Sequence, residues 1–166
     1  MEAPGWQIVL AVHAIVERDG QVLMVRNRYE DGPWWSLPGG RLEDHESFAD
    51  AVGRELHEET GLELVRLGAL AYTVHVHVDD RRVQYLSWAF AVDEWRGSAP
   101  GGRTRDPEGV VEAVRWFDQD ELADLPGWFP DPLPTWLRER RQYHYHYVRQ
   151  WDALPSRPRY RIAGRP

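Results

Sequence analysis

The sequence predicts one α/β domain that contains both strands and helices. Two observations favour this fold class. Apolar β-branched runs flank short turns at residues 18–20 and 79–80, and helical patterns lie over residues 47–60 and again near the C-terminus. The chain of 166 residues, 42% of them hydrophobic, is large enough for a shared core, because a domain usually needs about 100–200 residues. We expect a single domain over residues 1–166, with its core over about 6–126.

A pair of strands is expected first. Residues 6–16 and 21–25 are apolar and rich in β-branched side chains, and Arg18-Asp19-Gly20 separates them. Asp-Gly is a strong signal for a tight hairpin, so the two runs are expected to pair antiparallel. His13 interrupts the first run, and a loop rich in Gly, Pro and Trp follows over residues 29–40.

A helix is predicted over residues 47–60, and it ends before Gly61 because glycine commonly follows the last helical residue. A rotation of about 100° per residue places Phe48, Val52 and Leu56 on one apolar stripe. Two or three carboxylates fall on or beside this stripe, among Glu55, Glu58 and Glu59, while the opposite side carries Asp50, Arg54 and His57.

Residues 62–78 and 82–92 predict a second antiparallel hairpin around Asp79-Asp80. Alternation along the first strand places the valines on one face, namely Val74, Val76 and Val78, and opposes them with Thr73, His75 and His77. Two histidines on a strand are more often surface residues than metal ligands, so we assign no site to them.

The C-terminal part is expected to contain a loop over 96–107, a strand over 110–117, a short helix over 118–125 and a last helix from 135 to about 152. This last helix and a basic tail make up about residues 135–166. Residues 136–166 carry a net charge of +6, which leaves −13 on residues 1–135. Nucleic-acid binding needs a basic face, so the negative charge of residues 1–135 disfavours nucleic acid as a partner.

Composition excludes several kinds of chemistry. The chain has no cysteine, so any metal must bind oxygen or imidazole, and its 20 basic residues are all arginine, which excludes a catalytic or phosphate-binding lysine. No stretch approaches the roughly 18 apolar residues of a membrane span. The N-terminal segment does not resemble a signal peptide, because its apolar run is interrupted by His13 and is preceded by Glu2 instead of basic residues. A cytoplasmic location without a membrane partner is therefore expected.

The carboxylates on the helical stripe indicate a cation. Acids spaced three and four residues apart repel one another, and burying them costs several kcal/mol unless positive charge compensates. Oxygen ligands suit Mg²⁺, with Mn²⁺ as the alternative. The competing interpretation is a solvated helix end in which Arg54 pairs with Glu58. The glycines Gly39 and Gly40, just before the helix, let backbone approach a metal or phosphate.

The segment from residue 40 to 62 resembles the Nudix box. The order is a glycine, five residues, a glutamate, seven residues, Arg-Glu, an aliphatic residue, any residue, Glu-Glu, any residue, a glycine and an aliphatic residue. Every fixed position is matched, by Gly40, Glu46, Arg54, Glu55, Leu56, Glu58, Glu59, Gly61 and Leu62. The resemblance implies a Nudix-type α/β/α sandwich around a mixed β-sheet, here with an additional C-terminal helix.

The resemblance also implies a reaction, the metal-dependent hydrolysis of a phosphoanhydride bond in a nucleoside diphosphate linked to a group X. If the family's roles apply at the matching positions of this chain, Mg²⁺ would be ligated by Glu55, Glu58, Glu59 and the carbonyl of Gly39. Glu55 or a downstream glutamate would orient or deprotonate the attacking water. Glu46 and Arg54 would form the ion pair that braces the loop against the helix, as structural support.

Candidates outside the box rest on single residues. Glu112, preferred over Glu108, is a candidate for an extra catalytic carboxylate or a plain loop acid. The substrate-binding candidates, each with an alternative as surface charge or core packing, are Arg26, Arg28, Arg41 and Trp34.

The preferred substrate is a nucleoside triphosphate or a small nucleotide derivative. An ADP-ribose or nucleotide-sugar pyrophosphatase is the alternative. Nudix proteins that cleave ADP-ribose often carry a proline a little beyond the box, and no proline occurs here between Leu62 and Pro100, which disfavours ADP-ribose. Alternatives of other classes are a non-catalytic nucleotide-binding regulatory module and an interaction domain built on the aromatic, basic C-terminus. A homodimer is compatible with the sequence.

Overall fold

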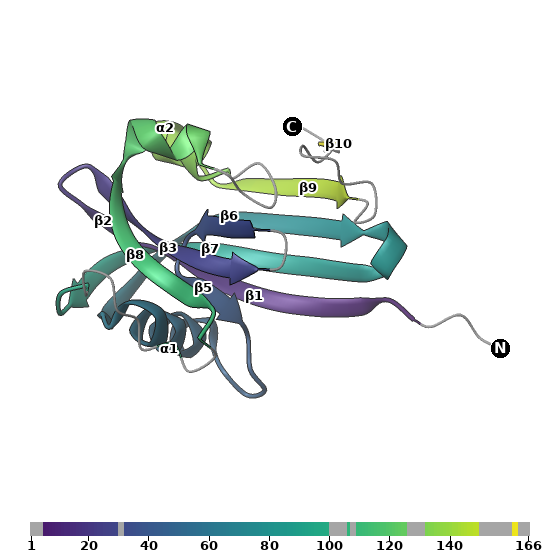
Figure 1. The fold of residues 1–166 in the computed structure, drawn as a ribbon, viewed down its shortest axis with the longest axis horizontal. Coiled ribbons are helices and arrows are strands. Elements are labelled where there is room, and N and C mark those ends of the chain that lie inside the picture. Colours follow the sequence, from purple (N-terminus) through teal and green to yellow (C-terminus); the bar gives the residue numbers. More distant parts are fainter. Residues whose placement is uncertain are drawn as a thin grey trace.

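Two β-sheets lie between two α-helices in the part of the chain that the computed structural model describes, residues 5–29, 32–99, 106, 109–125, 132–149 and 161–162 (Figure 1). The larger sheet has the strand order β10-β9-β6-β7-β1-β5. Its pairs β1–β7 and β6–β9 are parallel and the others antiparallel, so this sheet is mixed, as predicted. Its strands are β1 (Gln7–Ile15), β5 (Gly39–Arg41), β6 (Glu63–Val78), β7 (Val83–Arg96), β9 (Tyr143–Arg149) and β10 (Arg161–Ile162).

The smaller sheet is built around β3 (Gln21–Tyr29). This strand pairs antiparallel with three others, β2 (Glu17–Arg18), β4 (Gly32–Ser36) and β8 (Val111–Asp118). The first predicted hairpin is therefore wrong over most of its length, because only its end next to the turn pairs with β3, through Glu17, Arg18 and a bond from the Leu23 amide to the Val16 carbonyl. The run before them forms β1, which pairs with β5 and β7. A tight turn determines the pairing of the residues beside it, whereas a longer apolar run can satisfy its backbone in another sheet.

The second predicted hairpin is confirmed. Strands β6 and β7 pair antiparallel and are joined by a 3₁₀ turn, η1 (Asp79–Arg81). The predicted alternation also holds, since the valine face of β6 is buried while the face with Thr73, His75 and His77 is only half-buried.

The predicted first helix is confirmed as α1 (Phe48–Thr60). Ser47 caps its N-terminus in a reciprocal arrangement with Asp50, which satisfies amides that the helix leaves without partners. Gly61 ends the helix in the left-handed region at φ 73°, and its amide donates to the carbonyl of His57. The ends of α1 are therefore encoded locally.

The helices pack on opposite sides of the sheets, which gives the α/β/α layering (Figure 1). On one side α1 contributes Ala51, Val52 and Leu56 to a core with residues of β1, β3, β7 and β8. On the other side α2 (Leu133–Glu139) and the 3₁₀ helix η2 (Gln119–Asp124) pack against β6 and β9. Among the described residues, no helix is long and apolar enough to cross a bilayer.

The additional C-terminal helix is present as α2, but its predicted extent is wrong. The helix ends at Glu139, where Arg140 adopts φ 50° and its amide donates to the carbonyl of Trp136. Residues 143–149 instead form β9, parallel to β6, and residues 150–152 of the predicted helix lie outside the described part. The Tyr-His-Tyr-His-Tyr alternation has the two-residue period of a strand, and aromatic residues favour strands.

Candidate active site

The buried carboxyl group of Glu59 is at the centre of the site. Glu59 is only 8% exposed, and its Oε2 accepts a hydrogen bond from the Gly39 amide at 2.8 Å. Burial raises the pKa of Glu59 well above its ordinary value, and repulsion from Glu55, Asp106 and Glu58 adds to this, while the Gly39 amide opposes it. A nearby cation would therefore stabilise the ionised form of Glu59.

The two glycines bring backbone against these carboxyl groups. A Cβ on Gly40 would lie 2.7 Å from Cδ of Glu55, and a Cβ on Gly39 would lie 2.8 Å from Cα of His13. Real Cβ atoms do not approach other atoms this closely, so the backbone clash makes glycine necessary at Gly39, whereas a side chain at Gly40 would displace the Glu55 carboxylate. The backbone of β5 therefore lies directly against the carboxyl groups of Glu55 and Glu59.

Arg54 holds the loop to the helix and also pairs with two of the acids. Its Nε and Nη2 donate to the two carboxylate oxygens of Glu46 at 2.7 and 3.0 Å. Its Nη1 donates to Glu55 at 2.8 Å and to Glu58 at 3.3 Å. These contacts raise the pKa of Arg54 and lower that of Glu46. Both sequence interpretations of Arg54 therefore have geometric support, the brace to Glu46 and the pair with Glu58.

Arg54 does not point to solvent as the helical rotation suggested. Its side chain is 23% exposed and reaches around α1, where Nη2 also donates to the carbonyl of Arg41 at 3.0 Å. A long side chain can extend across a neighbouring face of the helix. The helical rotation of about 100° per residue gives only the direction in which the side chain leaves the backbone.

The donor set fits a hard divalent metal. The side chains of Glu55, Glu58 and Glu59 offer carboxylate oxygens, β5 adds backbone, and Glu59 carries the charge that most needs compensation. Oxygen ligands of this kind favour Mg²⁺ or Mn²⁺ over softer ions.

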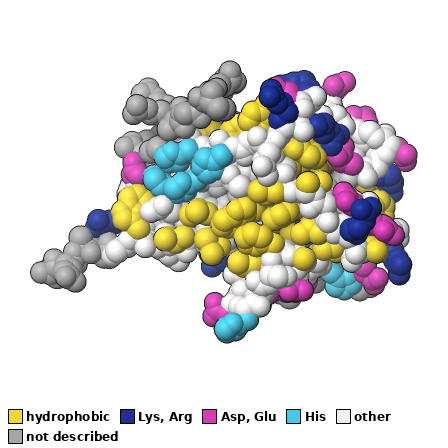
Figure 2. All heavy atoms as spheres, turned by 180° about the vertical axis from the view of Figure 1, so that it is seen from behind, with side chains coloured by type: hydrophobic (Ala, Val, Ile, Leu, Met, Phe, Trp, Pro, Cys, Tyr) yellow, Lys and Arg dark blue, Asp and Glu magenta, His cyan; other side chains and the backbone are white. Residues whose placement is uncertain are grey.

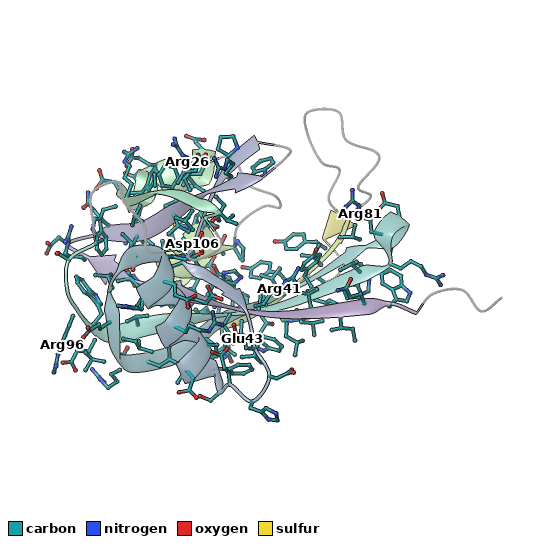
Figure 3. The ribbon with its side chains drawn as sticks, turned by 60° about the horizontal axis from the view of Figure 1, so that its bottom comes forward. Arg26, Arg41, Glu43, Arg81, Arg96 and Asp106 are labelled. Atoms are coloured by element: carbon teal, nitrogen blue, oxygen red, sulfur yellow. The ribbon has the colours of Figure 1, made fainter. Side chains whose placement is uncertain are left out.

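Asp106 is a site residue that the sequence analysis missed. Its Oδ2 accepts hydrogen bonds from the amides of Val110 and Val111, the latter at 2.8 Å, and its charge raises the pKa of Glu59. Figure 3 shows Asp106 beside α1. An aspartate at the end of a loop, a few residues before a strand, often binds backbone amides, and this signal could have identified it.

Glu112 is paired with the two predicted phosphate-binding arginines of β3. Its carboxylate lies 3.4 Å from Nε of Arg26 and 3.7 Å from Nε of Arg28. Arg28 also donates to the carbonyl of Gly109 at 3.2 Å. The structure thus gathers three predicted site residues into one ion-pair cluster across β3 and β8, whereas Glu108 lies outside the described residues.

The remaining candidates lie on β4 and β5. Trp34 is half-buried opposite Asn27, and Arg41 is exposed directly after Gly40. Figure 3 shows Arg41 near Glu43 and well separated from Arg26, so the predicted arginines do not form one cluster.

A pocket beside Gly39 was also missed. It is lined by side chains of both sheets and the β4–β5 connection, namely His13, Ser36, Leu37, Tyr72, Val74, Ser87 and Ala89. Burial lowers the pKa of His13 to about 4, partly opposed by a hydrogen bond with the Leu37 backbone. A neutral imidazole is therefore present at pH 7. His13 is a polar residue within the apolar run of residues 8–16, and this was the sequence signal that could have indicated a special role for it.

Known proteins share this motif and fold. A family model described as the NUDIX domain matches residues 7–139. An uncharacterized Nudix hydrolase of Bacillus subtilis, YvcI, is 25% identical over 116 residues, which cover 69% of this chain and 68% of that protein. A Mycobacterium tuberculosis protein named "Putative 8-oxo-dGTP diphosphatase 3" is 31% identical over 112 residues, 66% of this chain and 48% of that relative. The chain thus spans about half of that protein.

A solved structure of a MutT protein from Bacillus halodurans has the same fold. It superposes with a TM-score of 0.72 at 22% identity, and the alignment covers 95% of this chain and 99% of that one.

Proposed function

The chain belongs to the Nudix hydrolase family, and from this membership we propose that it hydrolyses a phosphoanhydride bond in a nucleoside triphosphate or a small nucleotide derivative. The observation that carries the proposal is Glu59, a buried carboxyl group that accepts from the Gly39 amide and whose charged form is disfavoured by burial and by three neighbouring acids, so that a cation would stabilise it.

Glu55, Glu58, Glu59 and the carbonyl of Gly39 are the proposed ligands of Mg²⁺ or Mn²⁺. When bound, such an ion neutralises charge on the bridging phosphate oxygens and lowers the pKa of a water molecule. Glu55 and Glu58 accept hydrogen bonds from Arg54 in this structure and would hold the ion with the same oxygens, while Glu46 would keep Arg54 against the loop.

Positioning of water is assigned to a carboxylate of this group. Glu55 is the first candidate, because it lies against Gly40 with its side chain 13% exposed. Asp106 is a second candidate for an added carboxylate, because its charge already acts on Glu59. Glu112 has its charge compensated by Arg26 and Arg28, so a direct catalytic role requires that these ion pairs open.

The pocket around His13 has a volume of only about 50 Å³, which is too small for a nucleoside, so no base-binding role is proposed for it. Arg41, Arg26 and Arg28 are the proposed phosphate contacts, and Trp34 is a proposed stacking residue. The triphosphate class is supported by the name of the M. tuberculosis relative, a putative 8-oxo-dGTP diphosphatase.

The test is product release in Mg²⁺ from nucleoside triphosphates, their 8-oxo forms, ADP-ribose, nucleotide sugars and dinucleoside polyphosphates. We expect a triphosphate class to be cleaved fastest, with turnover reduced at least about 1000-fold by Glu59→Gln. Glu63→Gln is the matched control, because Glu63 is an exposed glutamate at the start of β6. Preference for ADP-ribose or nucleotide sugars would overturn the substrate class. Nucleotide binding without any turnover would favour a regulatory module.

A further inference from the structure

Three histidines from distant parts of the chain meet on the surface of the larger sheet. His75 and His77 lie on β6, and the parallel pairing with β9 places His146 directly opposite His75. One ligand nitrogen of each histidine lies within 4.8 Å of those of the other two. Figure 2 shows histidine side chains gathered in one patch, and each of the three is half-buried.

We propose that His75, His77 and His146 form a binding site for a late first-row transition-metal ion such as Zn²⁺, separate from the carboxylate site on α1. Neutral imidazoles without carboxylates are ligands for Zn²⁺, Ni²⁺ or Cu²⁺ and poor ligands for Mg²⁺. Three protein ligands leave a fourth position for water or another ligand.

The spacing of the rings fits such an ion. The Nε2 of His146 lies 3.4 Å from the Nδ1 of His77. Two nitrogens that bind one zinc ion at about 2.0–2.1 Å in tetrahedral geometry are themselves roughly 3.4 Å apart. The ring centroids of the three histidines are separated by 4.3, 4.7 and 4.9 Å, so modest side-chain rotations bring the third nitrogen into place.

Gln84 supplies the outer contact that histidine metal ligands usually have. Its Oε1 lies 3.0 Å from Nε2 of His75 and 3.1 Å from Nε2 of His77. An amide oxygen accepts hydrogen bonds, so these contacts suit the tautomer of His75 and His77 in which Nε2 carries the proton and Nδ1 keeps its lone pair for an ion. Histidines that bind metals typically donate their other ring N–H to such an oxygen.

A bound ion would join β9 to β6. Strand β9 contacts the body through pairs from Tyr72 with Tyr143 to Val78 with Arg149, and His146 lies within this stretch. An ion that binds only the folded state raises its stability. Zinc should therefore raise the Tm of the full chain as well as bind to it.

The test is titration of the full chain with Zn²⁺ in excess Mg²⁺, followed by calorimetry, with Co²⁺ absorption as a second readout. We expect one Zn²⁺ per chain, the intense spectrum of tetrahedral Co²⁺, and at least about a 100-fold loss of affinity in His146→Gln. Gln84→Ala should lose about 10–100-fold, the usual effect of an outer contact. His77→Gln repeats the test on β6, in case the β9 variant does not fold.

His144→Gln is the matched control, because His144 lies on the same strand but contacts Thr73, and we expect its affinity to change less than about threefold. Unchanged Zn²⁺ affinity in His146→Gln and His77→Gln would overturn the proposal. So would a loss of Zn²⁺ binding in Glu59→Gln alone, because the ion would then occupy the carboxylate site. Nucleotide hydrolysis is measured separately, so the two proposals can fail independently.

Discussion

Glu59 shows how one buried acid can reduce the stability of the folded protein. Its carboxyl group is buried on the core side of α1, where three other acids raise its pKa. A folded state that holds a proton more tightly than the unfolded chain loses stability as the pH rises. This loss begins near the ordinary glutamate pKa of about 4.5 and continues until Glu59 ionises in the folded protein.

The variant Glu59→Gln tests this cost. In EDTA at pH 8 we expect it to be more stable than the parent protein, by about 1.4 kcal/mol for each unit by which the folded-state pKa is raised up to the pH of measurement. The difference should vanish as the pH falls below about 4.5, where the glutamate is protonated in both states. Thermal unfolding across pH measures it.

Mg²⁺ should reverse the order at pH 8, because only the parent protein gains from binding the ion. A parent protein that is the more stable one in EDTA at pH 8 would contradict the assigned electrostatics.

At the scale of the element, α1 combines local signals for a helix with features that a helix normally avoids. Capping at Ser47 and termination at Gly61 define it, while its buried face includes Glu59 and its middle includes Gly53. Gly53 weakens the helix, since glycine has more freedom to lose on folding than alanine.

Gly53→Ala should therefore stabilise the protein by about 0.5–1 kcal/mol. A Cβ there would meet only Leu64, whose Cδ2 lies at 3.6 Å, which is an ordinary van der Waals distance. Urea unfolding measures the change. Gly40→Ala serves as the contrast, because its Cβ would collide with Glu55. A Gly53→Ala protein that loses stability would show that α1 and β6 pack more closely than these distances indicate.

At the scale of the whole molecule, β9 connects the C-terminal part of the chain to the core. Tyr147 is 2% exposed and lies in the same core cluster as Trp136 of α2 and Val76 of β6. The aromatic C-terminal segment is thus used for packing at the Tyr147 position, and it also supplies His146 to the surface cluster.

Tyr147→Ala should cost about 3–5 kcal/mol of unfolding free energy, as truncation of a large buried aromatic side chain usually does. Chemical denaturation of the full chain gives the value. Tyr143→Ala, at the start of the same strand and only partly buried, should cost clearly less. Equal costs, or a loss below about 1 kcal/mol at Tyr147, would mean that β9 is not docked as described.

Much of the site follows from the sequence alone because its signals are short-range. The Ser47 and Gly61 caps, the 3.6-residue period that turns Glu59 inward, and the glycines before the helix all act within about 20 residues. The β6–β7 hairpin is local in the same sense, since one turn joins strands of alternating pattern. These elements could be predicted with their boundaries and faces nearly correct.

Only the tertiary structure decided which distant segments pair. Strand β1 pairs with β7 and not with the strand of the predicted hairpin, and β9 pairs with β6. The same packing brings the charge of Asp106 close enough to act on Glu59 and places His146 beside His75. A strand satisfies its backbone equally well beside many partners, and the choice depends on the summed burial of side chains across the whole core. The local sequence pattern determines whether a segment forms a helix or a strand and which of its faces is apolar. The total burial of side chains, which selects the pairing partners, depends on how all the elements pack together.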